Sequence, residues 1–471
     1  MSDTLMVGVA GVRGLVGIDL TPEVVARWAA AFGTWAKAGK IVLGRDARTS
    51  GPMFARAATA GLMSVGCQVI DVGLVTTPTV QLAVEHHRAA GGIILTASHN
   101  PIEWNALKFV GSDGIYLGVE DGARVAALAQ AKDGKIARAG YDGVGEVTAD
   151  PDSIARHLDA LLELRGLDVK AIRRRRFRVA LDTVRGAGGV VMPELLERLG
   201  CRVAAINLEP DGRFPRPPEP LPEHLKQLGS LVRRHKADVG IAVDPDVDRL
   251  ALVDERGTAI GEDYTLAFAV RAVLGTMERG NDGKRSRKRG SNGPSFHRSI
   301  VVCNLSTSLV VEDAARDCGA TVVRSPVGEA HVARTIIAHK AVIGGEGNGG
   351  VMYPPLHVGR DAPLAAAFVL ALLTRERRSV SDLVASAPRY SIVKDKVSRG
   401  PQLEPVYAGL RRAFAEASVD TQDGLRLAWP DRWLHVRPSN TEPIIRLIAE
   451  APTVADAERL IKEGRRLCAG S

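Results

Sequence analysis

Short apolar runs that end in polar loops, each followed by a segment of helical periodicity, recur through the first 376 residues. Residues 40–44, 91–95 and 237–243 are runs of this kind, and the apolar spacing over 22–37 is typical of an intervening helix. The alternation predicts mainly parallel β-sheets with helices on both faces. The pattern starts again near residue 153 and once more near residue 264, so we expect three similar α/β units.

Residues 377–471 follow a different pattern. Strand-like segments around 390–397, 425–428, 433–436 and 444–450 flank two helical segments, 403–416 and 454–469, which is typical of an α+β unit. A chain of 471 residues is also too long for a single hydrophobic core. We therefore predict three similar mixed α/β domains and a smaller α+β C-terminal domain, with boundaries at 1–150, 151–254, 255–376 and 377–471.

The composition, with 45% hydrophobic and 25% charged residues, is ordinary for a soluble globular protein. No apolar run approaches the roughly 20 residues that span a bilayer, so we expect no membrane association. The N-terminus lacks a basic region followed by a long apolar one, and we expect no signal peptide. The five cysteines are scattered without a C-x-x-C pair, which argues against disulfides or zinc and favours a reducing cytoplasm.

Much of the net charge of +8 lies in one segment, residues 280–298, which holds six basic residues against one aspartate. This basic insertion is rich in Gly and Ser and has no periodicity, so we predict a disordered surface segment inside the third domain. Phe296 is its only aromatic residue, and stacking on nucleic-acid bases is therefore not expected. The modest basic excess elsewhere suits phosphorylated substrates, and we expect no specific nucleic-acid partner.

Ser98 is the first candidate for chemistry. The apolar run at 91–95 delivers it into the loop T-A-S-H-N-P, whose Asn-Pro step marks a turn. Ser98 is thus placed at the mouth of a strand, where α/β proteins bind ligands. The alternative is a turn serine that caps a helix.

Asp244, Asp246 and Asp248 follow the apolar strand at 237–243 in the loop D-P-D-V-D-R. Residues two apart in an extended chain point the same way, so three carboxylates should converge. Their mutual repulsion favours a hard cation with oxygen ligands, and Mg²⁺ fits best. Arg249, the next residue, could hold a phosphate or neutralise the cluster. The alternative is an acidic turn on the surface.

Two further loops carry polar groups suited to a sugar phosphate. Arg437, Ser439, Asn440 and Thr441 in R-P-S-N-T-E-P bring a guanidinium, two hydroxyls and an amide together, a suitable cradle for a dianionic phosphate. The same residue types also simply make turns. In G-E-G-N-G-G at 345–350, Glu346 and Asn348 could contact the hydroxyls of a sugar.

Taken together, these four loops resemble, in order, the phosphoserine, metal, sugar-specificity and phosphate-binding loops of the α-D-phosphohexomutase family. The resemblance extends to G-V-R-G around Arg13, G-R-D-A-R-T-S-G at 44–51, Asn105 with Lys108, and D-T-V-R-G-A-G-G at 182–189. It implies three related α/β domains and a smaller C-terminal one around a central cleft.

The resemblance also implies a reaction. A phosphoserine at Ser98 would donate its phosphoryl group to a hexose monophosphate, giving a hexose 1,6-bisphosphate that returns its other phosphate to Ser98; the bisphosphate would also serve as activator. One Mg²⁺ per active site would be held by Ser98, Asp244, Asp246 and Asp248. The reacting phosphate would be surrounded by Arg13, His99, Lys108 and Arg249, and the other gripped by Arg437, Ser439, Asn440 and Thr441.

Two positions depart from the family pattern. Some members end the sugar loop with a histidine assigned as general base, where this chain has Gly350; His357 is our preferred replacement, with His331 and Lys108 as alternatives. Pro326 stands where relatives often have a lysine before Val-Gly.

The two substrate loops point to different sugars, G-E-G-N-G-G to phosphoglucosamine mutases and R-P-S-N-T-E-P to phosphomannomutase/phosphoglucomutase. We expect a phosphoglucosamine mutase first, a phosphomannomutase/phosphoglucomutase second and a non-catalytic sugar-phosphate-binding protein third. We expect a phosphosugar as its partner and a monomer or homodimer.

Overall fold

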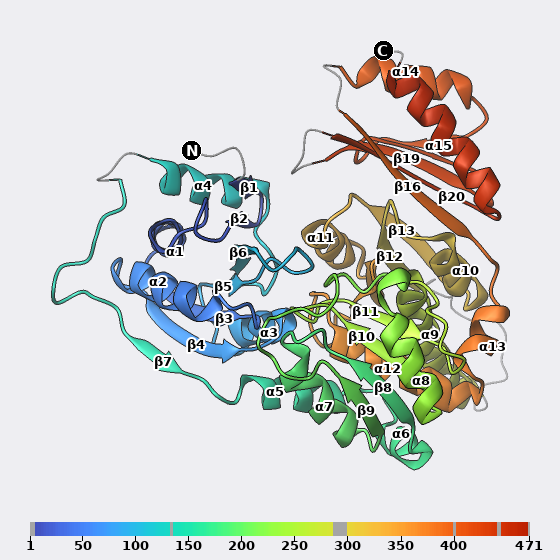
Figure 1. Ribbon diagram of the computed structural model, residues 1–471, viewed down its shortest axis with the longest axis horizontal. Helices are drawn as coiled ribbons and strands as arrows, with labels where there is room; N and C mark the ends of the chain where they lie inside the picture. The colour runs from blue at the N-terminus through green and yellow to red at the C-terminus, as the bar shows by residue number, and fades with distance from the viewer. Residues whose placement is uncertain (1–4, 132–134, 286–298, 399–401, 440–443, 470–471) are drawn as a thin grey trace.

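The computed structural model describes residues 5–131, 135–285, 299–398, 402–439 and 444–469. These residues form four β-sheets, each covered by helices, in four successive units along the chain (Figure 1). Three units are α/β and the fourth is a smaller α+β unit, which confirms the predicted fold class.

The first unit contains a seven-stranded sheet with the order β1-β2-β6-β5-β3-β4-β7. Its strands are β1 (Met6–Gly8), β2 (Gly11–Leu15), β3 (Lys40–Arg45), β4 (Gln68–Leu74), β5 (Gly91–Leu95), β6 (Trp104–Gly111) and β7 (Val147–Ala149). Its helices are α1 (Pro22–Trp35), α2 (Gly51–Met63), α3 (Thr77–His86) and α4 (Val119–Gln130). Strands β5, β3, β4 and β7 are parallel, whereas β1, β2 and β6 are joined by antiparallel pairing. The sheet is therefore mixed rather than mainly parallel, because β6 returns directly from the Ser98 loop.

Alternation along β3 shows why helices cover both faces of this sheet. Ile41 and Leu43 pack in one buried cluster with residues of α1 and α2, and Val42 packs on the other face with Val80 and Val84 of α3. Successive side chains of a strand point to opposite faces, so a strand without polar residues must be covered twice.

The second and third units each contain a four-stranded sheet, with the orders β11-β10-β8-β9 and β13-β12-β14-β15. The strands are β8 (Arg178–Asp182), β9 (Arg202–Ile206), β10 (Val239–Val243), β11 (Leu250–Val253), β12 (Ile300–Asn304), β13 (Thr321–Ser325), β14 (Ile343–Glu346) and β15 (Gly350–Met352). The helices are α5 (Ser153–Leu162), α6 (Val169–Arg175), α7 (Gly188–Arg198), the 3₁₀ turn η1 (Pro222–His224), α8 (Lys226–His235), α9 (Asp263–Arg285), α10 (Leu309–Asp317), α11 (Glu329–His339), α12 (Ala362–Glu376) and α13 (Val380–Ala385). In each sheet three strands are parallel and the last, β11 or β15, returns antiparallel.

These two units share one core. Leu181 and Ile241 of the second sheet belong to the same buried cluster as Val301 and Ile343 of the third. Helix α12 is apolar over most of its surface and supplies many residues to that cluster, as expected for a helix buried on several sides.

The fourth unit is a five-stranded antiparallel sheet, β16-β20-β19-β18-β17, with two helices. It consists of β16 (Ser391–Ser398), β17 (Ser418–Asp420), β18 (Leu425–Ala428), β19 (Trp433–Pro438), β20 (Ile444–Ala451), α14 (Glu404–Ala413) and α15 (Val454–Ala469). Glu450 attaches this unit to the third one, because its carboxylate accepts hydrogen bonds from Ser308 Oγ and from Leu309 N at 2.8 Å, at the start of α10.

The first residues of the predicted basic insertion differ from the prediction. Helix α9 runs to Arg285, so residues 280–285 are helical instead of lacking secondary structure. The remainder of the insertion, 286–298, lies outside the described residues. Within the described part of the chain, no helix combines the length and the apolar character that crossing a membrane requires.

Candidate active site

Ser98 lies three residues beyond the end of β5, at the mouth of the strand as predicted, and its backbone is in the left-handed region with φ +50°. Few residues other than glycine adopt this conformation, and such strain is concentrated at functional sites. The Ser98 amide donates to Thr96 Oγ1 at 2.8 Å, and its hydroxyl donates to Asp244 Oδ2 of the second unit at 3.1 Å. The loop therefore aims the serine hydroxyl at the aspartate cluster.

Arg48 holds this loop in place, and sequence reasoning missed it although it lies in the quoted segment G-R-D-A-R-T-S-G. Its side chain is fully buried. Its guanidinium donates to the carbonyl oxygens of Ser98 and Asn100 at 2.7 Å each, and to those of Pro101 at 2.7 Å and Trp104 at 2.8 Å. Five N–H donors in a fixed plane make arginine suited to gathering several carbonyls of one loop.

The three predicted aspartates converge as expected. Asp244, Asp246 and Asp248 are buried, and one carboxylate oxygen from each lies within 4.8 Å of the others. Burial and the neighbouring charges of Asp248 and Asp246 raise the pKa of Asp244 well above its usual value. For Asp246, burial would raise the pKa, but the charge of Lys108 and the hydrogen bonds from Lys108, Asp244 and Thr77 together lower it.

The cluster fits a divalent cation. Asp246 Oδ1 and Asp248 Oδ1 are buried without a hydrogen-bond partner in the described part of the chain. Buried carboxylate oxygens are costly unless paired or bound to a metal. An all-oxygen donor set with the Ser98 hydroxyl beside it is the chemistry that Mg²⁺ prefers.

Asp246 and Asp248, which do not contact Ser98, are hydrogen-bonded to two different units. Asp246 Oδ2 accepts hydrogen bonds from Thr77 Oγ1, in the first turn of α3, and from Lys108 Nζ of β6, both at 2.9 Å. Asp248 Oδ2 accepts from Arg360 of the third unit at 2.5 Å. The metal loop is therefore held by the first and third units, and Lys108 lies at the site as predicted.

Gly186, in the segment D-T-V-R-G-A-G-G, supports the metal loop by having no side chain. A Cβ there would lie 2.6 Å from Pro245 Cα, and the next residue, Ala187, donates its amide to Pro245 O at 2.8 Å. Backbone thus packs directly on backbone under Asp244, which only glycine allows.

Three of the residues predicted around the reacting phosphate lie beside Ser98. His99 Nδ1 is 3.4 Å from Ser98 Oγ, and Arg13 donates to Asn100 Oδ1 at 2.8 Å. Arg249 contacts Glu219 at 3.0 Å, and its charge, followed by burial, lowers the pKa of His99 well below the usual value. Both effects favour the neutral form of the His99 imidazole.

The sugar-specificity loop is joined to the metal loop through Arg360. Glu346 is buried and accepts from Arg360 at 2.8 Å, from Asn304 at 2.8 Å and from the amide of Gly328 at 3.1 Å. Arg360 also pairs with Glu329 at 3.0 Å. Both carboxylate oxygens of Glu346 thus have partners within the protein. The predicted role of Glu346 toward sugar hydroxyls stays a prediction.

Asn348, the other residue predicted in this loop, makes a local contact. Its Oδ1 accepts from the amide of Gly350 at 3.2 Å. The adjacent Gly349 packs against the metal loop, where Leu250 N donates to Gly349 O at 3.1 Å. The sugar loop and the metal loop are therefore neighbours in space, as the predicted site requires.

The phosphate-binding loop is only partly described. Arg437 Nη1 lies 3.5 Å from Asp423 Oδ2 in its own unit, and Ser439, the residue after β19, is buried and donates its amide to Ile444 O at 2.9 Å. Asn440 and Thr441 lie outside the described residues. No hydrogen bond within the described ranges brings Arg437 to Ser98 or the aspartates, so the predicted grip on the second phosphate stays a prediction.

His357, like Arg437, makes no hydrogen bond to Ser98 or the aspartates within the described ranges. It is 3% exposed, and its Nε2 lies 3.0 Å from Asp361 Oδ2, which His157 Nε2 also contacts at 2.8 Å. This buried pairing gives no support to His357 as a general base, because a base must reach the sugar hydroxyl. The sequence alone does not distinguish a buried structural histidine from a catalytic one.

Comparison with known proteins adds to this geometry. Four family models match in order: the phosphoglucomutase/phosphomannomutase α/β/α domains I (residues 4–135), II (155–257) and III (281–390), and the C-terminal domain (394–467). A protein of Methanopyrus kandleri described as "Probable phosphoglucosamine mutase" is 37% identical over 97% of this chain and 96% of its own length. A "Phosphoglucomutase/phosphomannomutase" of Thermococcus kodakarensis is 37% identical over 98% and 97%.

Solved structures agree with these matches. A phosphoglucomutase/phosphomannomutase family protein from Burkholderia thailandensis superposes with a TM-score of 0.81 at 25% identity, covering 98% of this chain and 96% of that one. An N-acetylphosphoglucosamine mutase from Aspergillus fumigatus shares the fold, with a TM-score of 0.61 at 15% identity over 99% and 96% of the two chains. The predicted resemblance is confirmed, and the chain belongs to the phosphoglucomutase/phosphomannomutase family, the α-D-phosphohexomutases.

Proposed function

We propose that this phosphohexomutase interconverts hexose 6-phosphates and hexose 1-phosphates through a phosphoserine at Ser98 and a hexose 1,6-bisphosphate intermediate. The observation that carries the proposal is the hydrogen bond of 3.1 Å from Ser98 Oγ to Asp244 Oδ2, inside a buried cluster of three carboxylates. A serine hydroxyl so placed can carry a phosphoryl group directly beside a cation site.

In this proposal, Asp244, Asp246, Asp248 and a phosphoserine oxygen would hold Mg²⁺, which when bound neutralises charge on the phosphoryl group. The protein itself mainly positions and stabilises, because phosphoryl transfer needs little covalent help. Arg48 fixes the loop carrying Ser98. Cationic Arg13, Arg249 and Lys108 surround the phosphoryl group and stabilise its charge, and neutral His99 lies next to the hydroxyl.

For the sugar, we propose glucosamine 6-phosphate as the preferred substrate, with mannose and glucose 6-phosphates as the alternative. The loop G-E-G-N-G-G supports the first, and so do further relatives 32% identical to this chain that are named as phosphoglucosamine mutases. The two 37% identical relatives carry one name of each kind. The distinction therefore depends on measurement of turnover.

The test compares the three hexose 6-phosphates at equal concentration, with Mg²⁺ and catalytic glucose 1,6-bisphosphate, and follows formation of the 1-phosphates. We expect turnover when Mg²⁺ and glucose 1,6-bisphosphate are both present, with the highest kcat/KM for glucosamine 6-phosphate. Omission of the bisphosphate should greatly reduce the rate. A higher kcat/KM for mannose 6-phosphate or glucose 6-phosphate would instead assign the enzyme as a phosphomannomutase/phosphoglucomutase. Failure of all three substrates would refute mutase activity.

A second candidate function is sugar-phosphate binding without catalysis. Ser98 and the three buried aspartates count against it, because a binding protein has no use for a strained serine aimed at a cation site. Binding of a hexose phosphate without any phosphoryl transfer would favour it.

We also propose that the enzyme works in a reducing cytoplasm. No disulfide joins the five cysteines, all of which lie in the described part of the chain, and Cys67 and Cys303 are buried in hydrophobic clusters. This is the pattern expected of small core residues rather than of a disulfide framework.

A further inference from the structure

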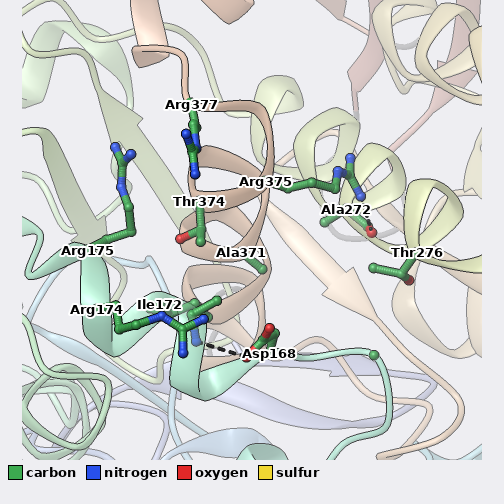
Figure 2. A pocket seen from close by; sticks show the side chains of 12 residues that line it. Asp168, Ile172, Arg174, Arg175, Ala272, Thr276, Ala371, Thr374, Arg375 and Arg377 are labelled. Carbon is green, nitrogen blue, oxygen red and sulfur yellow. Dashed lines mark hydrogen bonds between the residues drawn. The ribbon is translucent and has the colours of Figure 1, made fainter. Parts of the chain in front are cut away.

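A cavity opens where α6, α9 and α12 meet, away from Ser98 and the aspartates. It has a volume of about 530 Å³ and is lined by Arg174 and Arg175 of α6, by Arg375 of α12 and by Arg377 just after it. Figure 2 shows these four arginines around the pocket, with Asp168 as the carboxylate among the labelled residues. Nothing in the proposed mutase reaction uses them.

Most of this positive charge has no counterion. Among the described residues, Arg174, Arg175 and Arg377 make no ion pair with a carboxylate; Arg175 instead lies over the Phe177 ring at 5.2 Å. Asp168 Oδ1 is occupied as the N-cap of α6, where it accepts the amide of Ala171 at 2.8 Å. Arg174, Arg175 and Arg377 are exposed, so their guanidinium groups are open to an anion from solvent.

Arg375 lines the pocket with a guanidinium whose position is fixed by hydrogen bonds. Its guanidinium donates to the carbonyl oxygens of Ala272 at 3.0 Å and Arg271 at 2.8 Å on α9. Figure 2 shows it pointing toward Ala272. Carbonyl oxygens fix the direction of a guanidinium without removing its charge. The nearby Glu376, 3.4 Å away, is itself paired with Arg271 at 2.9 Å.

Four apolar side chains in the lining suit the organic part of a ligand, and Thr276 and Thr374 also line the cavity. Ala171 and buried Ile172 of α6 contribute, together with Ala272 of α9 and Ala371 of α12. The volume lies within the range of about 300–1,000 Å³ typical of small-molecule sites. Arginine is the side chain best suited to phosphate, which it can bind with two parallel hydrogen bonds.

We propose that this pocket binds a small organic di- or triphosphate, with its phosphate groups on Arg174, Arg175 and Arg377 and its organic part against the alanines and Ile172. The lining carries four arginines against one aspartate, which matches a ligand of about three negative charges better than a monophosphate. A nucleoside diphosphate such as ADP has this charge and size.

The pocket is distinct from the candidate active site but connected to it by one helix. Asp361 caps the N-terminal end of α12, next to Arg360, and Arg375 and Arg377 lie at its C-terminal end. At about 1.5 Å per residue, the helix separates the two ends by roughly 20 Å. A ligand in the pocket therefore contacts none of the residues around Ser98.

Nucleic acid is the competing class of ligand, because α6 contains the run Arg173-Arg174-Arg175. The described residues that line the pocket include no aromatic side chain on which a base could stack. A concave site walled by three helices also suits a small molecule better than an extended strand. The test below includes the strand as an outcome.

The experiment is isothermal titration calorimetry of ADP into the full-length protein at low salt without Mg²⁺. Arg174→Gln/Arg377→Gln is compared with Arg234→Gln/Arg412→Gln, a control that removes two exposed arginines elsewhere. We expect ADP to bind the wild type and the control within twofold, and the pocket variant at least tenfold more weakly. Adenosine, which has no phosphate, should not bind. Thermal unfolding of both variants should match that of the wild type.

Four results would overturn the proposal. ADP that fails to bind the wild type, or that binds the pocket variant as tightly, would show that the pocket is not the site. An equal loss in the control variant would show attraction by net charge alone. A ten-nucleotide single strand that binds more tightly than ADP, and loses affinity in the pocket variant, would assign the surface to nucleic acid.

Discussion

Replacing Arg360 with methionine is expected to lower the free energy of unfolding by about 3–5 kcal/mol, because it leaves buried carboxylates without their cation. The guanidinium of Arg360 is 8% exposed and pairs with Asp248 at 2.5 Å, Glu346 at 2.8 Å and Glu329 at 3.0 Å. Urea unfolding, followed by circular dichroism, measures the loss. Mutase activity should fall as well, since Asp248 loses the group that orients it.

The matched control for Arg360→Met is Arg124→Met. Arg124 also pairs with two carboxylates, Glu120 and Asp121, but it is 62% exposed on the surface of α4. Exposed ion pairs contribute little because water screens them. The control should unfold at the urea concentration of the wild type. Equal effects of the two substitutions would contradict the role assigned to Arg360.

Replacing Asp244 with asparagine is expected to reduce kcat by about 10²–10³-fold or more, since it removes a charge that acts on the transferred phosphoryl group. Stability should not fall, because asparagine keeps the shape and relieves repulsion among carboxylates. Burial and the charges of Asp248 and Asp246 already raise the pKa of Asp244 in the folded protein. The measurements are kcat as a function of Mg²⁺ concentration and the thermal unfolding midpoint.

The control for Asp244→Asn is Asp254→Asn. Asp254 is also buried, but it accepts the amides of Arg256 and Thr258 in a turn after β11, and asparagine can accept them equally well. Its kcat should equal that of the wild type. An Asp244→Asn variant that keeps a tenth or more of the activity, with unchanged Mg²⁺ dependence, would contradict the proposed cation site.

The strands that could be predicted from the sequence are those with a clear hydrophobic pattern. Strands β5 and β10 are fully buried apolar runs that end in polar loops, so both the strands and the loop residues Ser98 and Asp244 could be located from the sequence. The antiparallel strands β2 and β6 were missed. Strand β6 carries Asn105 and Lys108, and β2 carries Arg13, because these strands deliver polar groups to the site. Polar residues in a short strand resemble a loop.

Site residues could be predicted where several polar residues share one loop. They could not be predicted where a single buried arginine contacts loops that are distant in the sequence. The three aspartates do converge, but the segment that carries them is a turn with Val247 at φ +62°, not the extended chain on which the prediction rested. Arg48 and Arg360 were missed, because a sequence shows the charge of an arginine but neither its burial nor its partners. His357 was assigned a catalytic role for the same reason, since its pairing with buried Asp361 is set by tertiary packing.

The most direct test of the central claim, that Ser98 stores a phosphoryl group, is the intact mass of the protein. The wild type and Ser98→Ala are each incubated with glucose 1,6-bisphosphate and Mg²⁺, desalted, and weighed before and after phosphatase treatment. We predict one added phosphoryl group on the wild type, removed by phosphatase, and none on Ser98→Ala. A phosphoryl group that persists on Ser98→Ala, or a wild type that never acquires one, would contradict the account.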